Sequence, residues 1–144
     1  TSLFTPLPME GIKLLFGVYQ DPSLESLKKM LDVFVYDPSA LTDELIELRH
    51  QAMMNDSHHL ENFITSMELS KFNWGDYTNN LPDIDNDTLV VWGLNDRFVP
   101  LDWGLKLVNM IPNSELHVFS QCGHWAQWEH ADKFNRLVLD FLKR

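Results

Sequence analysis

The 144-residue sequence is 44% hydrophobic and 12% aromatic, which excludes an intrinsically disordered chain and suffices for one domain with a sizeable core. The formal net charge is −10 at pH 7 and no basic run exceeds two residues, as at Lys28-Lys29, so we expect no binding to nucleic acid. No apolar run approaches the roughly 20 residues that cross a bilayer, so we expect no membrane partner, and the single Cys122 and lack of a leader-like segment favour a cytoplasmic protein.

Residues 1–71 are predicted to form helices joined by loops. Pro6 and Pro8 indicate a loop over Thr1–Glu10, because proline lacks a backbone donor and restricts the residue before it. Apolar residues then recur at the 3.6-residue period of an amphipathic helix. Capping residues and prolines set the bounds of four predicted helices: Gly11–Tyr19, from Asp21-Pro22 to Asp37-Pro38, Thr42 to about Asn55, and Ser57 or His58 to Met67.

Residues 72–87 are polar and punctuated by Gly75 and Pro82, which is typical of a connector with one short helical turn. Its segment 83–87 begins like a calcium-binding loop. However, Thr88 stands where that loop needs glycine, and Leu94 stands where it needs a glutamate ligand. We therefore predict no metal site here.

From Thr88 the pattern becomes that of a β/α unit. Its predicted elements are a strand over 88–92, a helix over about 101–110, a strand over 115–119 and a helix over about 131–143. Two parallel strands with apolar faces do not form a stable sheet alone, because parallel sheets are normally extended at their edges and covered on both sides. The sequence thus predicts an α/β fold whose remaining strands come from elsewhere.

Asp96 and His124 each follow one of the predicted strands. The two residues lie 28 positions apart, which leaves room for the turn, helix and strand of a βαβ unit. Both would then emerge at the carboxyl edge of the sheet, where such folds bind ligands. Since a carboxylate fixes the tautomer and orientation of an imidazole that acts as a general base, we predict that Asp96 and His124 are a catalytic acid and base.

Two segments carry a resemblance to a known family: Gly93–Pro100, which reads GLNDRFVP, and Cys122–Glu129, which reads CGHWAQWE. Together they resemble the end of an α/β hydrolase, and more narrowly a meta-cleavage product hydrolase, a C–C bond hydrolase of bacterial aromatic (biphenyl-type) degradation. Pro8–Phe16 and the helices after it resemble the helical lid of these enzymes. The resemblance implies the carboxyl-terminal half of the fold: a lid at 1–71, a connector at 72–87 and the last two strands with their helices at 88–144.

The nucleophile elbow Gly-x-Ser-x-Gly of this family is absent, because none of the six glycines is followed two places later by serine. We therefore expect the chain alone to be inactive. The serine would come from an amino-terminal half, present either as a second polypeptide or as a segment missing from the sequence. The resemblance also implies that the complete unit assembles into a homo-oligomer.

The implied reaction is hydrolysis of a C–C bond in a 2-hydroxy-6-oxohexa-2,4-dienoate, with an aryl group at carbon 6. The serine, activated by His124 with Asp96 behind it, attacks the 6-oxo carbonyl, and no metal or organic cofactor is required. The resemblance places Arg49 at the carboxylate of the substrate, a task that suits forked guanidinium donors. The alternative for a single helical arginine is a surface ion pair.

Further residues are candidates for an apolar substrate pocket. They are Trp125 beside His124, Phe98 and Val99 after Asp96, and Leu15, Met30 and Phe34 on the predicted lid helices. The alternative for each is ordinary core packing. Cys122 lies two positions from His124, too close in sequence for the imidazole to face it, so we interpret it as a packing residue. The other five histidines are expected to be structural or solvated.

Two alternative functions stay open at this point. The same acid and base would serve ester hydrolysis equally well, because one fold hosts many chemistries. The missing serine also allows a non-catalytic binding or regulatory fragment.

Overall fold

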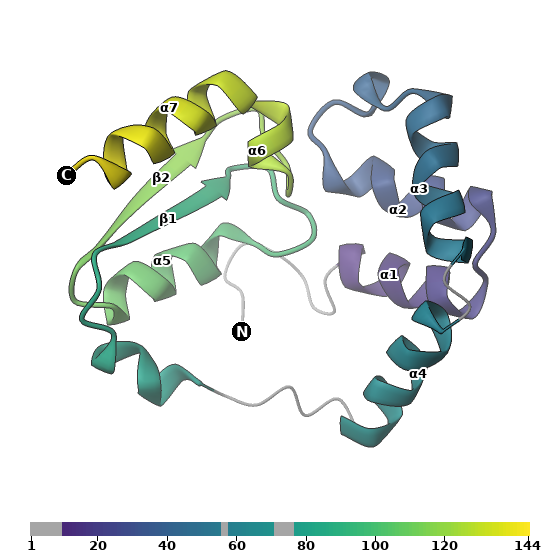
Figure 1. Ribbon diagram of the computed structural model, residues 1–144, viewed down its shortest axis with the longest axis horizontal. Helices are drawn as coiled ribbons and strands as arrows, with labels where there is room; N and C mark the ends of the chain where they lie inside the picture. Colours follow the sequence, from purple (N-terminus) through teal and green to yellow (C-terminus); the bar gives the residue numbers. More distant parts are fainter. Residues whose placement is uncertain (1–9, 56–57, 71–76) are drawn as a thin grey trace.

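The computed structural model describes residues 10–55, 58–70 and 77–144. Figure 1 shows two parts, which we call the helical part (residues 10–70) and the β/α part (residues 77–144). Within the described ranges, no helix is long and apolar enough to span a membrane. The predicted loop before Glu10 lies outside these ranges, as do residues 56–57 and 71–76.

The helical part consists of four α-helices and one short 3-10 helix within its described residues. They are α1 (Glu10–Gln20), α2 (Leu24–Phe34), η1 (Pro38–Ala40), α3 (Asp43–Asn55) and α4 (His59–Ser70). The predicted cap of α3 is confirmed, because the hydroxyl of Thr42 accepts the backbone N–H of Leu45 at 3.2 Å. The start predicted for α2 was wrong: Ser23, and not Asp21-Pro22, caps the helix by accepting the N–H of Ser26.

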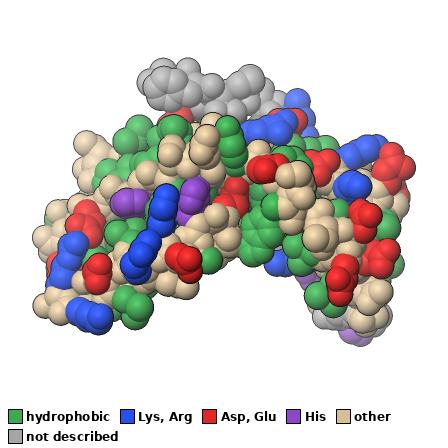
Figure 2. Space-filling view, turned by 90° about the horizontal axis from the view of Figure 1, so that it is seen from above, with side chains coloured by type: hydrophobic (Ala, Val, Ile, Leu, Met, Phe, Trp, Pro, Cys, Tyr) green, Lys and Arg blue, Asp and Glu red, His purple; other side chains and the backbone are tan. Residues whose placement is uncertain are grey.

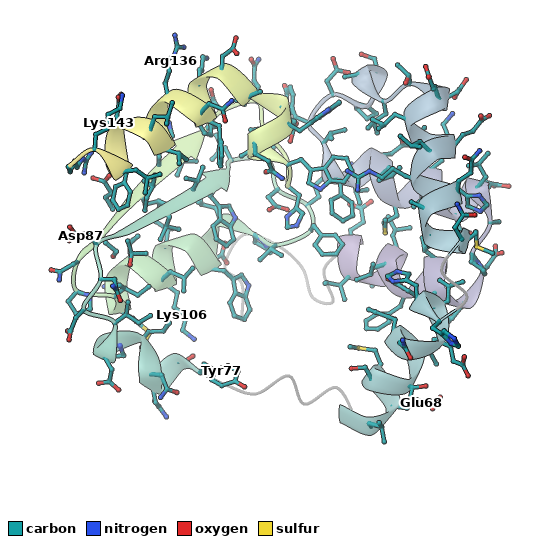
Figure 3. The ribbon with its side chains drawn as sticks, in the orientation of Figure 1. Glu68, Tyr77, Asp87, Lys106, Arg136 and Lys143 are labelled. Carbon is teal, nitrogen blue, oxygen red and sulfur yellow. The ribbon has the colours of Figure 1, made fainter. Side chains whose placement is uncertain are left out.

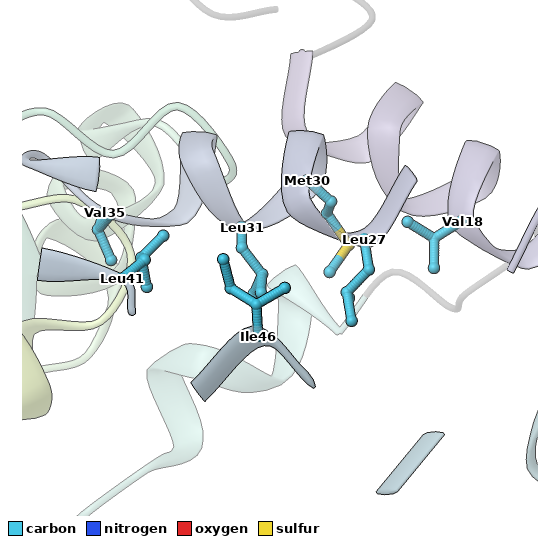
Figure 4. Close-up of a cluster of buried hydrophobic side chains, with 7 residues drawn as sticks. All are labelled: Val18, Leu27, Met30, Leu31, Val35, Leu41 and Ile46. Carbon is cyan, nitrogen blue, oxygen red and sulfur yellow. The ribbon is translucent and has the colours of Figure 1, made fainter. Parts of the chain in front are cut away.

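A continuous apolar cluster holds α1, α2 and α3 together (Figure 4). Its central side chains, Leu27 and Leu31, are 4% and 2% exposed, so burying them drives the packing of these helices. The full cluster comprises Val18, Leu27, Met30, Leu31, Val35, Leu41 and Ile46. Met30 and Leu15, two of the predicted pocket residues, belong to this packing, Met30 as a buried member and Leu15 against its edge.

The β/α part contains two parallel strands between helices. Its elements are η2 (Thr78–Asp83), β1 (Thr88–Gly93), α5 (Leu101–Met110), β2 (Ser114–Phe119), α6 (Ala126–Glu129) and α7 (Ala131–Leu142). The strands pair in register from Thr88 opposite Ser114 to Gly93 opposite Phe119, so both end at the same edge. Figure 1 shows α5 and α7 on opposite sides of the strands, as the α/β prediction requires.

Other helix boundaries also differ from the predictions: α2 ends at Phe34, before the predicted stop at Asp37-Pro38. Glu10 is the first residue of α1 and not the last residue of a loop, and α4 continues three residues beyond Met67 to Ser70. The short helix α6 was not predicted at all. Four residues are too few to produce a helical period, which explains why the sequence pattern missed it.

The surface bears charges of both signs. On the face seen in Figure 2, Lys and Arg side chains are interspersed with Asp and Glu and form no continuous basic surface. On the outer face of α7, Arg136 and Lys143 point away from the strands (Figure 3).

The two-stranded sheet has an open edge, because among the described residues β1 pairs only with β2. Two large apolar side chains of the β/α part are also exposed, Trp103 by 49% and Leu142 by 72%.

Candidate active site

Asp96 is fixed by the turn that follows β1. One carboxylate oxygen, Oδ1, accepts the backbone N–H groups of both Phe98 and Val99 at 2.8 Å. The side chain is only 5% exposed, and hydrogen bonds to a carboxylate that is withdrawn from water are strong. These two bonds orient the second oxygen, Oδ2, toward the end of β2.

His124 lies in the loop after β2 and meets that second oxygen. Its Nδ1 is 2.8 Å from Oδ2 of Asp96, so Nδ1 carries the proton that the carboxylate accepts. The imidazole is 30% exposed, and among the described residues no group lies within hydrogen-bond distance of its Nε2. The geometry thus leaves Nε2 able to accept a proton from a third group.

The two loops are joined by close backbone contacts. The N–H of Asn95 donates to the carbonyl of Cys122 at 2.8 Å. Gly93 lies directly against the same loop, where a Cβ atom would overlap the carbonyl oxygen of Gly123 and stand 2.6 Å from that of Cys122. Glycine is therefore required at position 93 for the acid and base to approach each other.

Aromatic side chains surround the imidazole. The rings of Phe34 and Phe98 lie 5.0 and 4.9 Å from that of His124, between centroids. Phe34 also lies 5.1 Å from the ring of Trp125. A cavity of about 160 Å³ opens beside the pair, lined by Asp96, His124 and Val99 among others. Four of the predicted pocket residues, Phe34, Phe98, Val99 and Trp125, thus gather at this site.

Arg49 reaches the same site from α3 of the helical part. Its guanidinium carbon lies 4.9 Å from the centre of the Trp125 ring, within the range of a cation–π contact. The side chain is exposed, and none of the carboxylates in the described ranges forms an ion pair with it. Arg49 is therefore a cation beside the predicted base whose forked donors are available to an anion.

Leu15 and Met30 do not share this arrangement. Both pack with the apolar cluster of the helical part, and neither has the aromatic ring by which Phe34 and Phe98 contact His124. Their contacts in the described structure are those of core residues. Their assignment to the substrate pocket stays a prediction.

Cys122 is fully buried and serves as a packing residue in the described structure, against Phe119 and Ala126. Burial, together with the nearby carboxylate of Glu129, raises the pKa of its thiol to about 12. A thiol with such a pKa is protonated at neutral pH and is a poor nucleophile. The interpretation of Cys122 as a non-catalytic residue is supported.

The remaining histidines are engaged away from Asp96. The imidazole Nε2 of His130 lies 3.1 Å from the carbonyl oxygen of Ser120, and its ring stacks on Phe119. The others contact further groups: His50 the carbonyl of Pro22, His58 the carboxylate of Glu61, His59 the hydroxyl of Tyr19, and His117 the ring of Phe119. Across the described ranges, no cluster of three His, Cys, Asp or Glu side chains is arranged to hold a metal ion.

Three contributors to the site were not found from the sequence. They are the amides of Phe98 and Val99 that hold Asp96, the carbonyl of Phe34 that accepts the N–H of His124 at 2.6 Å, and the carboxylate of Glu129. The first has a local signal, since an aspartate commonly accepts N–H groups two and three residues later. The carbonyl of Phe34 binds a residue 90 positions later, and Glu129 joins Gly123 to Tyr36, which is 93 positions before Glu129, so neither contact leaves a sequence pattern.

A carboxylate after one parallel strand, an imidazole after the next and a helical part over both define the class of α/β hydrolases. The sequence profile of the alpha/beta hydrolase fold matches residues 9–131, and the chain belongs to this family. The predicted fold class is thereby confirmed. The match spans both the helical part and the strands.

Several curated relatives are more than half identical to the chain. The 2-hydroxy-6-oxononadienedioate/2-hydroxy-6-oxononatrienedioate hydrolase of Burkholderia vietnamiensis is 55% identical over 99% of this chain and 50% of its own length. The 2-hydroxy-6-oxo-6-phenylhexa-2,4-dienoate hydrolase of Burkholderia cepacia is 57% identical over 98% of this chain and 49% of its own. The chain therefore spans about half the length of the curated relatives that it matches.

A solved structure of a meta-cleavage product hydrolase has the same fold as this chain over half of its own length. The meta-cleavage product hydrolase of Pseudomonas fluorescens IP01, determined as a variant with bound acetates, superposes with a TM-score of 0.85 at 35% identity. The superposition covers 96% of this chain and 52% of that one. The described helices and strands are thus arranged as they are in half of a meta-cleavage product hydrolase.

Proposed function

We propose that this chain supplies the acid and base of a serine hydrolase that cleaves a C–C bond in a 2-hydroxy-6-oxohexa-2,4-dienoate. The observation that carries the proposal is the 2.8 Å contact between Nδ1 of His124 and Oδ2 of Asp96. It leaves Nε2 of the imidazole as the proton acceptor for a serine hydroxyl. The names of the relatives supply the substrate class, since those proteins are hydrolases of 2-hydroxy-6-oxo dienoates.

The proposed reaction begins when the dienol of the substrate shifts to its keto form. The serine oxygen then attacks the 6-oxo carbonyl carbon while His124 takes the hydroxyl proton. The bond between carbons 5 and 6 breaks, carbon 5 receives its electron pair together with the proton held by His124, and carbon 6 stays on the serine as an ester. Water, deprotonated by His124, hydrolyses this ester to the carboxylic acid. Asp96 stabilises the imidazolium in both halves of the reaction.

The nucleophile in this proposal comes from outside the 144 residues. The sequence has no Gly-x-Ser-x-Gly, and it spans about half of the relatives' length. We call this chain together with the polypeptide that carries the serine the complete unit. Intact mass spectrometry of the native protein tests this step: we expect a further segment of similar size, either covalent or separate. A lone species of 16.8 kDa would overturn it.

Arg49 and the aromatic side chains provide the proposed substrate contacts. The guanidinium beside Trp125 would bind the carboxylate of the dienoate through its forked donors. Phe34, Phe98 and Trp125 would contact the aryl group at carbon 6. The alternative substituent is a carboxyethyl-type chain, which the name of the Burkholderia vietnamiensis relative, a 2-hydroxy-6-oxononadienedioate hydrolase, favours.

A substrate panel tests the reaction in the complete unit. The compounds are 2-hydroxy-6-oxo-6-phenylhexa-2,4-dienoate, 2-hydroxy-6-oxononadienedioate and p-nitrophenyl acetate, a simple ester. We expect cleavage of the phenyl dienoate to benzoate, with a kcat/KM at least about tenfold above that for the other two, a preference of 1.4 kcal/mol or more. A higher kcat/KM for the dienedioate would mean that the substituent at carbon 6 is a carboxyethyl-type chain and not an aryl group. Turnover of the ester alone would overturn the proposal of C–C hydrolysis.

Three further predictions belong to the same proposal. Residues 1–71 would form the lid over the substrate, 72–87 the connector and 88–144 the carboxyl-terminal part of the hydrolase core. The complete unit would assemble into a homo-oligomer in the cytoplasm. Its chemistry would require no metal or organic cofactor, because serine, histidine and aspartate supply the nucleophile, base and acid.

A further inference from the structure

Glu129, the last residue of α6, lies at the junction between the helical part and the loop that carries His124. One carboxylate oxygen, Oε1, accepts the backbone N–H of Gly123 at 2.8 Å. The other, Oε2, accepts the backbone N–H of Tyr36 at 2.7 Å. A single side chain thus joins two backbone segments that are far apart in the sequence.

The same two segments also meet directly. The N–H of His124 donates to the carbonyl of Phe34, the last residue of α2, at 2.6 Å. A Cβ atom on Gly123 would stand 2.5 Å from that carbonyl oxygen and 2.9 Å from the Cα of Val35. The end of α2 is therefore in close backbone contact with the residues on either side of the Gly123–His124 peptide bond.

We propose that Glu129 is a positioning residue, through which the helical part holds the base, His124, at the carboxylate of Asp96. On one side, the loop that carries His124 is bound to the β/α part: the N–H of Asn95 donates to the carbonyl of Cys122, and Asp96 contacts the imidazole. On the other side, Phe34 and Tyr36 bind it to the end of α2, and Glu129 accepts a backbone N–H from each of these two segments at once. The helical part would then determine the geometry of the base as well as cover the substrate.

The physical basis is the strength of the two hydrogen bonds. Both donors are backbone amides and the acceptor is a half-buried carboxylate, a combination stronger than a neutral hydrogen bond. Replacing Glu129 with glutamine keeps the size of the side chain but presents one NH₂ group to one of the two N–H donors. One amide then loses its acceptor, and the loop around Gly123 shifts.

The test compares Glu129→Gln with Glu115→Gln, a matched control whose carboxylate pairs with Arg144 at the far end of β2. The kinetic readout rests on the proposed function, and it uses the phenyl dienoate and the complete unit. A second readout is independent of any substrate: the downfield proton NMR signal of Nδ1–H of His124, identified by its loss in Asp96→Asn. The melting temperature of each variant is measured alongside.

For Glu129→Gln we expect kcat to fall by about tenfold to a hundredfold, as a small misplacement of a catalytic group does, while KM stays within about twofold. The Nδ1–H signal should shift or broaden. Glu115→Gln should leave kcat, KM and this signal unchanged. A lower melting temperature with unchanged kcat and an unchanged signal would overturn the proposal. If the unaltered protein cleaves no dienoate, the proposed function fails, and the NMR signal alone decides the role of Glu129.

Discussion

The backbone of Gly93 at the end of β1 lies against the carbonyl oxygen of Gly123 in the loop after β2, with no space for a side chain between them. This contact sets the distance between the two loops that carry Asp96 and His124. The glycine at position 93 is therefore explained by backbone packing at the carboxyl edge of the sheet. Gly123 is required by a second contact, with the carbonyl oxygen of Phe34 and the backbone of Val35 at the end of α2.

Replacing Gly93 with alanine should destabilise the protein by about 2 kcal/mol or more, because the added methyl group meets backbone atoms that cannot rotate away. Gly17→Ala is the matched control: it lies within α1 and a Cβ there meets nothing within 4 Å. That variant should be stabilised by about 0.5–1 kcal/mol, since alanine favours a helix interior. Urea unfolding measures both, and equal stability of Gly93→Ala and the parent would contradict the packing argument.

Replacing Arg49 with lysine should raise KM for the phenyl dienoate about tenfold or more, because an ammonium group cannot bind a carboxylate through two parallel bonds. KM for p-nitrophenyl acetate, which has no carboxylate, should not change. Arg136→Lys, on the outer face of α7, is the control and should change neither value. An equal rise in KM for both substrates would show that Arg49 acts on the fold and not on the carboxylate.

The stability of the protein should fall at high pH partly because of Cys122. Its pKa is about 12 in the folded state against an ordinary value of 9.0, so the unfolded chain loses the proton first. The contribution of the neutral thiol is therefore complete below about pH 9 and is lost as the pH rises toward 12. Between these limits the free energy of unfolding should decrease by up to about 1.4 kcal/mol per pH unit.

Urea unfolding of the parent and of Cys122→Ala at pH 8, 9 and 10 isolates this contribution, since all other groups titrate in both proteins. The parent should lose stability more steeply than the variant above pH 9. Parallel losses would mean that the thiol keeps an ordinary pKa in the folded protein.

The sequence was sufficient for much of this architecture. Apolar patterns identified the α-helices of the helical part, α5, α7 and both strands. The positions of Asp96 and His124 in the loops that follow those strands predicted that the two residues would meet. Local signals failed where they were short or ambiguous: α6 has four residues, and Ser23 caps α2 where Asp21-Pro22 was expected. These errors changed boundaries and left the site intact.

The support around His124 could not be predicted in the same way. Tyr36 and Glu129 are 93 positions apart, and their hydrogen bond depends on how the helical part packs on the β/α part. Likewise, Arg49 meets Trp125 through the fold and not through any spacing in the sequence. Such contacts are decided by tertiary packing, which a period of two or 3.6 residues does not describe.

The most direct measurement of the central claim is the single-turnover rate of phenyl dienoate cleavage by the complete unit, followed by absorbance. It is made for the parent, His124→Ala, Asp96→Asn and the control Asp132→Asn, an exposed acid at the start of α7. The account predicts losses of about 10³-fold or more for His124→Ala and Asp96→Asn and none for the control. Cleavage by either of these two variants at the rate of the parent would contradict the assignment of Asp96 and His124 as acid and base.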